Sequence, residues 1–294
     1  MKDLVQDGDS LVADSPFAEG VDRREFIKVA LGTGFAAATL PVAAQSVIKT
    51  DTAGLTAGTV NLSVNGQTVP VYRAQPEGKS NLPVILVISE IFGVHEHIAD
   101  VARRFAKQGY LALAPELFVR QGDPGNIADI ATLMKDIISK TPDAQVMADL
   151  DACVAWAAKN GGNLDKIGIT GFCWGGRVTW MYSSHNPKVK AGVAWYGRLQ
   201  GDATANTPKH PVDIAPTLTV PVLGLYGAKD TGIPLDTVEN MKAALAKGSS
   251  QSAFVVYPDA GHAFHADYRP SYNEKDAKDG WTRALSWFKS HGVA

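Results

Sequence analysis

The run Gly171-Phe172-Cys173-Trp174-Gly175-Gly176 constrains the fold of this chain more than any other feature of its sequence. It follows an apolar segment at 167–170 that is typical of a buried strand, and it precedes residues with helical apolar spacing. A side chain on so sharp a strand-to-helix turn needs small neighbours and strained dihedral angles, because the chain passes close to itself. We therefore predict that Cys173 is a nucleophile exposed above a sheet, where the helix N-terminus lowers the pKa of its thiol. The alternative is a small buried cysteine beside a glycine-rich turn.

Strand-like runs alternate with helix-spaced segments through most of the chain. The segment at 62–72 alternates around Asn65-Gly66, which is typical of a β-hairpin. Further strands are expected at 82–89, 110–114, 167–170, 191–196, 222–226 and 254–257. This rhythm predicts an α/β fold with a mostly parallel central sheet and helices on both faces. We expect one domain over residues 59–294, within which the Pro- and Thr-rich segment 201–219 is irregular.

The composition excludes several classes of protein. The chain has 294 residues, 45% of them hydrophobic, and a formal net charge of −2. This is neither a disordered chain nor a multi-span membrane protein. The near-neutral charge argues against a nucleic-acid binder, which needs a basic excess. Two cysteines cannot make a disulfide scaffold or an all-cysteine zinc site.

Residues 1–44 have the pattern of an export signal. Arg23-Arg24 precedes Phe26-Ile27-Lys28, the next segment is uncharged, and Val42-Ala43-Ala44 offers small residues before a cleavage point. These features predict a twin-arginine signal, cleaved after export of the folded protein by the twin-arginine translocase. We expect a periplasmic protein that is not inserted in the membrane and whose mature chain begins with residues 45–58. The alternative is an uncleaved N-terminal membrane anchor, although its glycines and polar residues make it a poor span.

An acid and a histidine follow later strands in the chain order nucleophile, acid, histidine. Asp230 comes just after the last strand but one, and His262 comes just after the last. A cysteine nucleophile needs a base, and the base needs an orienting acid. We therefore predict a catalytic triad of Cys173, His262 and Asp230. Asp259 is the competing acid but is expected to be a turn residue, and Cys153 is expected to be inert core.

Five segments together resemble the dienelactone hydrolase family of the α/β-hydrolases, which is carboxymethylenebutenolidase-like. They lie at 89–93, 114–118, 171–176, 227–230 and 260–264. The glycine-flanked cysteine and the Glu-x-Phe-Gly loop are fairly specific, because most α/β-hydrolases carry serine. The resemblance implies hydrolysis of a small-molecule ester or lactone through an acyl-cysteine intermediate, without a cofactor. It also implies an oxyanion hole made by the backbone N–H groups of Ile91 and Trp174.

The same resemblance gives roles to residues around the triad. Glu90 would hydrogen-bond the resting Cys173 thiol and take its proton when substrate arrives, since a carboxylate in a largely apolar pocket would have a raised pKa. The alternative for Glu90 is a helix-entry acid satisfied by local N–H groups. Arg120 stands where the family binds a substrate carboxylate, with a surface arginine as the alternative. Phe92 and Tyr196 are expected to line the substrate pocket.

The chain departs from the family at one position. The family's second arginine, four residues after the histidine, is Ala266 here, and Arg269 lies three positions further on. This leaves the identity of the natural substrate open.

Three other readings of the sequence can be considered. The pairs His95 with His97 and His262 with His265 resemble parts of a zinc site, but no third histidine follows in a metallohydrolase pattern, so we expect no metal. The same triad could also serve a thioesterase or an acyl-transfer enzyme. From a different class, the chain could be an exported, non-catalytic binding protein.

Overall fold

The computed structural model describes residues 48–294. The predicted signal, residues 1–44, lies outside the described residues. Strand β1 begins at Leu55, inside the segment 45–58 that we expected to precede the domain. Within the described range, no helix is both long and apolar enough to cross a lipid bilayer.

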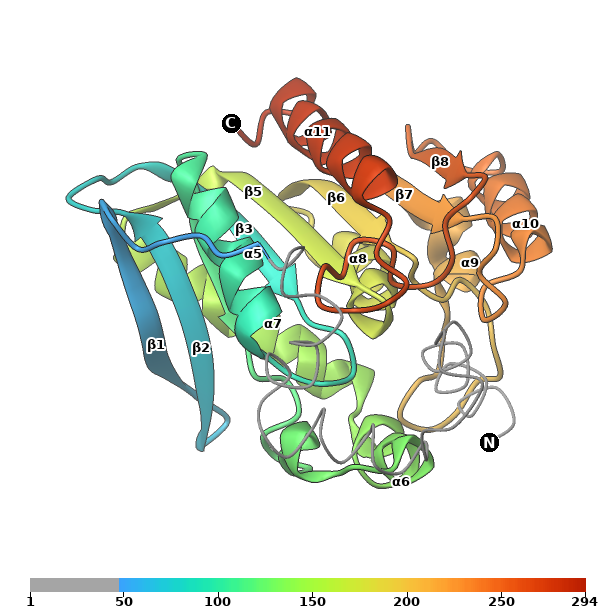
Figure 1. The fold of residues 1–294 in the computed structure, drawn as a ribbon, viewed down its shortest axis with the longest axis horizontal. Helices are drawn as coiled ribbons and strands as arrows, with labels where there is room; N and C mark the ends of the chain where they lie inside the picture. The colour runs from blue at the N-terminus through green and yellow to red at the C-terminus, as the bar shows by residue number, and fades with distance from the viewer. Residues whose placement is uncertain (1–47) are drawn as a thin grey trace.

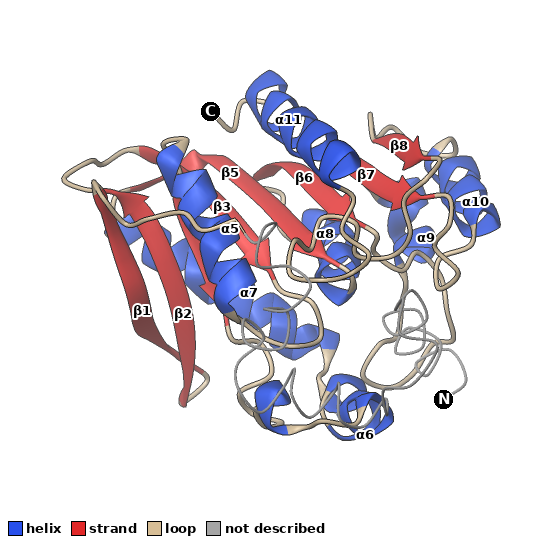
Figure 2. Cartoon of the chain, in the orientation of Figure 1, coloured by secondary structure: helices blue, strands red, loops and turns tan. Residues whose placement is uncertain are grey.

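The described chain is built on one eight-stranded sheet with the order β1-β2-β4-β3-β5-β6-β7-β8 (Figures 1 and 2). The strands are β1 (Leu55–Val64), β2 (Gln67–Pro76), β3 (Leu82–Ile88), β4 (Leu111–Pro115), β5 (Gly162–Phe172), β6 (Val189–Trp195), β7 (Val222–Gly227) and β8 (Ala253–Tyr257). The β1–β2 and β2–β4 pairs are antiparallel, and the strands from β4 through β3 to β8 pair in parallel. The mostly parallel sheet of the predicted α/β fold is confirmed.

The β1–β2 hairpin turns at Asn65-Gly66, as predicted. Both turn residues have positive φ angles, 51° for Asn65 and 77° for Gly66. This backbone twist matches the right-handed twist of the flanking strands, and it is tolerated by asparagine and glycine. The hairpin is longer than expected and forms one edge of the sheet.

Helices cover both faces of the sheet (Figure 1). They are α5 (Glu96–Lys107), α6 (Ile130–Asp136), α7 (Asp143–Lys159), α8 (Trp174–His185), α9 (Pro211–Ile214), α10 (Leu235–Leu245) and α11 (Glu274–Ser290), with short 3-10 turns η1 (Pro124–Asn126), η2 (Ile138–Lys140) and η3 (Ala215–Thr217). Helices α5 and α11 share one face, where the Phe105 and Trp281 rings lie 4.6 Å apart. Helices α7 and α8 share the other, where the Tyr182 hydroxyl donates to Asp151 at 2.9 Å.

The core is densest where parallel strands are covered on both faces. In β3, residues Val84 to Ile88 have no exposed surface, which explains the unbroken apolar run in the sequence. The segment 201–219 is irregular as expected, apart from α9 and η3. The loops after β3, β5, β7 and β8 all leave the carboxyl edge of the sheet, which is where ligands bind in open α/β sheets.

Candidate active site

Cys173 occupies a strained turn between β5 and α8. It is the N-cap of α8, with φ 54° and ψ −115°, and its N–H donates to the Trp195 carbonyl at 3.0 Å. A Cβ added to Gly171 would lie 2.2 Å from the Gly175 carbonyl oxygen, and one added to Gly175 would lie 2.4 Å from that of Ile88. The predicted need for glycine on both sides therefore has a direct steric cause.

Cys173 is buried, although the turn predicted an exposed side chain. Only 3% of the residue is accessible. The reason is that the neighbouring loops supply buried side chains around the thiol: Tyr196 after β6, His262 and Tyr268 after β8 all interact with it electrostatically. The cysteine therefore lies at the bottom of the site.

The structure brings His262 and Asp230 together with Cys173. Nδ1 of His262 lies 2.7 Å from Oδ2 of Asp230. The other carboxylate oxygen, Oδ1, accepts from the N–H groups of Gly232 at 2.9 Å and Ile233 at 3.1 Å. Asp259, the competing acid, is exposed and pairs instead with Lys229.

The surroundings of His262 favour its protonated form over the neutral imidazole. Burial disfavours its imidazolium form, but the charges of Asp230 and Cys173 and its contacts with both raise the pKa of His262 well above 6.5. The arrangement favours transfer of a thiol proton to this imidazole.

Glu90 is fully buried, but the expected direction of its pKa shift is wrong. Burial by itself raises the pKa of Glu90, yet hydrogen bonding with His95, the positive charge of Arg269 and a hydrogen bond from Tyr268 lower it to about 2. The Tyr268 hydroxyl donates to Oε2 of Glu90, and Nε2 of His95 lies 3.9 Å from the same oxygen. The pocket around Glu90 is therefore polar, and the carboxyl is ionised at neutral pH.

The structure places Tyr268 and Arg269 beside Glu90, and the sequence analysis gave neither residue a role. Tyr268 is 3% exposed and binds Glu90 directly. The guanidinium of Arg269 lies 5.8 Å from the ring centre of Phe92 and 6.0 Å from that of Tyr268. Arg269 thus reaches the site that Ala266 leaves without an arginine. The sequence signal for both residues was their place in the partly polar run 265–269, which begins three positions after His262.

The predicted oxyanion groups follow β3 and open α8. Ile91 lies in the loop after β3 and Trp174 is the first residue of α8, and neither N–H donates to another backbone carbonyl in the described chain. Free N–H groups at a helix N-terminus can bind a developing negative charge.

Tyr196 lies against the triad in an unusual backbone conformation. Its φ is 38°, it has no exposed surface, and its ring lies 5.1 Å from that of His262. Its hydroxyl is buried without a hydrogen-bond partner in the described structure. Burial and the negative charges of Glu90 and Cys173 raise the pKa of Tyr196 well above 10, so the hydroxyl keeps its proton.

Arg120 is engaged elsewhere, contrary to the expectation of a substrate arginine. Its two terminal nitrogens bind the two oxygens of Asp149 in α7 at 2.7 and 2.8 Å. Asp149 is fully buried, so this bidentate pair compensates a buried charge. The sequence could not reveal the pair because its partners belong to a loop and a helix far apart in the chain.

The histidines of the suggested metal pairs have other partners. His97 binds Asp267 at 3.0 Å, and His265 stacks on Phe172 at 5.1 Å between ring centres and lies tilted against Trp195 at 4.5 Å. Within residues 48–294 no three His, Cys, Asp or Glu side chains converge as a metal site. Cys153 is fully buried in α7, and burial raises the pKa of its thiol.

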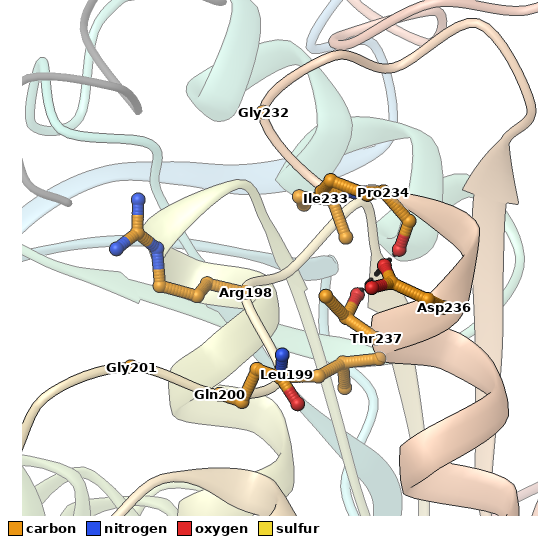
Figure 3. A pocket seen from close by; sticks show the side chains of 9 residues that line it. All are labelled: Arg198, Leu199, Gln200, Gly201, Gly232, Ile233, Pro234, Asp236 and Thr237. Carbon is orange, nitrogen blue, oxygen red and sulfur yellow. Dashed lines mark hydrogen bonds between the residues drawn. The ribbon is translucent and has the colours of Figure 1, made fainter.

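A cavity of about 440 Å³ opens beside the loop that carries Asp230. Figure 3 shows residues 198–201, after β6, facing the start of α10 across it. Gly232 and Ile233, the donors to Asp230, form part of its wall. Its polar lining comes from Arg198, Gln200, Asp236 and Thr237.

A sequence model of the dienelactone hydrolase family matches residues 69–292. The chain belongs to this family. It is 57% identical over 276 residues to a Methylorubrum extorquens protein named "Putative carboxymethylenebutenolidase", covering 93% of this chain and 94% of the relative. A protein of the same name from Salmonella typhimurium is 54% identical over 261 residues, covering 88% and 96%. A crystal structure of a Klebsiella pneumoniae protein named "Putative Dienelactone Hydrolase" has a TM-score of 0.79 at 57% identity, covering 80% of this chain and 98% of that one.

Membership makes this chain a dienelactone hydrolase-like enzyme, a hydrolase of carboxylic ester or lactone bonds. The enzyme class and the α/β-hydrolase fold expected from the sequence are confirmed.

Proposed function

We propose that this member of the dienelactone hydrolase family cleaves small esters or lactones with Cys173 as nucleophile, His262 as general base and acid, and Asp230 as the orienting acid. One observation carries the proposal. His262 is fixed to Asp230 at 2.7 Å beside a cysteine on a strained, glycine-flanked turn. Nucleophile, base and orienting acid in this relation are the arrangement of acyl-transfer catalysis.

In the first half-reaction the thiol proton passes to Nε2 of His262, and the sulfur adds to the substrate carbonyl carbon. The N–H groups of Ile91 and Trp174 bind the resulting oxyanion. The C–O bond to the leaving alcohol then breaks, and the alkoxide takes the proton from His262. A lactone opens in the same way, with the alcohol still attached to the acyl group.

In the second half-reaction water gives a proton to His262 and its oxygen adds to the thioester carbonyl. The C–S bond breaks, the sulfur recovers the proton, and the carboxylic acid is released. Water enters only in this half, so a thioesterase or acyl-transfer enzyme would share all residues and differ in the substrate or in the acceptor.

Glu90 has a restraining role in this proposal. A carboxyl with a pKa of about 2 is a poor acceptor for a thiol proton, so we assign the proton to His262 instead. In this proposal the Glu90 carboxylate faces the resting Cys173 thiol without taking its proton. Its negative charge disfavours the thiolate until substrate enters.

The cavity beside Asp230 is proposed to hold the part of the substrate that lies away from the scissile bond. Its volume falls in the range of small-ligand pockets. The polar lining suits an oxygen-rich group, and Phe92 and Tyr196 line the pocket next to Cys173 in this proposal.

We also propose that residues 1–44 direct the folded enzyme to the periplasm through the twin-arginine translocase. The support is the sequence pattern at Arg23-Arg24. Replacing both by lysine should retain the enzyme in the cytoplasm. Continued export of that variant would contradict the proposal.

The function is tested by steady-state hydrolysis of p-nitrophenyl acetate and of a simple lactone. Cys173→Ala should lower kcat at least about a thousandfold while near-ultraviolet circular dichroism shows an intact fold. The matched control is Cys153→Ala, which should keep near-normal turnover. Wild-type turnover by Cys173→Ala would contradict the cysteine mechanism.

A further inference from the structure

A buried ionic cluster lies next to the site but outside the triad, and Asp267 is at its centre. Asp267 is 1% exposed. Its Oδ1 lies 3.0 Å from Nδ1 of His97, and its Oδ2 accepts from Arg104 at 2.7 Å and from the Ile48 N–H at 3.2 Å. A buried carboxylate with this many partners is tightly fixed.

The same cluster holds the beginning of the described chain. The Thr50 N–H donates to Asp100 at 2.5 Å, and the Thr50 carbonyl accepts from Arg103 at 2.8 Å. Arg104 joins the two halves, because its Nε binds Asp100 at 2.5 Å while its Nη2 binds Asp267. Helix α5 therefore clamps both the N-terminal segment and the loop after His262.

Asp267 immediately precedes Tyr268, the tyrosine that donates to Glu90. The Tyr268 ring lies against two histidines at the start of α5, with ring centres 5.0 Å from His95 and 5.1 Å from His97. Because His97 also binds Asp267, both the backbone and the ring of Tyr268 are fixed by the same cluster.

We propose that Asp267 is a positioning residue, which acts through Tyr268 to hold the Glu90 carboxylate next to Cys173. The proposal rests on the proposed function, in which Glu90 restrains the thiol. It gives the N-terminal segment and helix α5 a part in catalysis, since both fix Asp267 without touching the substrate.

A double-mutant cycle tests whether Asp267 acts through Tyr268. Asp267→Asn and Tyr268→Phe should each make iodoacetamide alkylation of Cys173 at pH 7 about tenfold faster, and the double variant should react about tenfold faster as well, rather than about a hundredfold. Each single variant should also lower the apparent pKa of Cys173 alkylation by iodoacetamide, because a displaced Glu90 no longer disfavours the thiolate. A merely structural role would leave that pKa unchanged.

Two further variants keep the test decisive. Asp51→Asn removes an exposed pair with Lys107 on the same segment and should change neither readout. Arg104→Lys keeps the charge but lacks the planar fork that binds Asp100 and Asp267 at once. It should also lower the alkylation pKa of Cys173, and it replaces Asp267→Asn in the test if that variant does not fold.

The outcomes separate this proposal from the proposed function. Independent effects on the alkylation rate that multiply in the double variant, or folded Asp267→Asn and Arg104→Lys variants with a wild-type alkylation profile, would overturn the role of Asp267 alone. An active Cys173→Ala variant, assayed beside them, would overturn the proposed function.

Discussion

Nδ1 of His262 and Oδ2 of Asp230 lie 2.7 Å apart, although the two residues follow different strands of the sheet. The remaining oxygen of Asp230 is bound by two backbone N–H groups, so its carboxylate cannot rotate away. The imidazole is thereby fixed with its other nitrogen available to the thiol.

The first prediction separates Asp230 from its competitor. Asp230→Asn should reduce kcat about a thousandfold or more, because the amide neither fixes the imidazole tautomer nor stabilises imidazolium. Asp259→Asn is the matched control, since Asp259 is exposed and pairs only with an exposed lysine. It should leave kcat/KM within about twofold of wild type. Reversed effects in steady-state assays would show that the acid is mis-assigned.

The second prediction concerns Glu90. Glu90→Gln should make iodoacetamide alkylation of Cys173 at pH 7 about tenfold faster, because removal of a nearby negative charge stabilises the thiolate. Peptide mass spectrometry identifies the alkylated residue, and Cys153 serves as an internal thiol that stays unmodified. Slower alkylation of the variant would indicate that Glu90 promotes thiolate formation.

The third prediction tests the structural role of Arg120. Arg120→Ala leaves Asp149 buried without its bidentate partner and should lower the free energy of unfolding by about 3 kcal/mol. The KM for neutral and for carboxylate-bearing esters should change equally. Urea unfolding and paired kinetics measure the two effects. A rise in KM confined to carboxylate-bearing substrates would indicate that Arg120 binds the substrate carboxylate.

The fourth prediction is a pH dependence of stability. Burial lowers the pKa of His262, but Asp230 and Cys173 raise it well above the ordinary 6.5. The stabilisation is therefore fully present below about pH 6.5 and is lost as the pH rises through the raised pKa. In urea unfolding at pH 6 to 9, the stability difference between wild type and His262→Gln should shrink with increasing pH. A difference that grows would contradict the assigned direction.

The sequence was sufficient for the fold because alternation of apolar strands and helices, the Asn65-Gly66 turn and the glycine-flanked elbow are local patterns. It also indicated Cys173, Asp230 and His262, since loops after parallel strands meet at one edge of the sheet. The structure brings these three side chains together, and their catalytic roles stay a prediction.

What the sequence missed depends on contacts between distant segments. Burial raises the pKa of Glu90, but His95 nearby and Arg269 and Tyr268 far along the chain lower it, and no sequence motif indicates those distant contacts. The ion pair of Arg120 could not be predicted for the same reason, because its partner Asp149 comes from a helix. Burial of Cys173 likewise depends on two separate loops, the one after β6 and the one after β8.

The most direct test of the account is detection of the acyl-enzyme. Wild-type enzyme mixed rapidly with p-nitrophenyl acetate and quenched in acid should carry one acetyl group, on the peptide that contains Cys173. The adduct should be absent from Cys173→Ala and should persist longer in His262→Gln, in which water is not activated. An acetyl group on another residue, or turnover at the wild-type rate without any adduct, would contradict the cysteine mechanism.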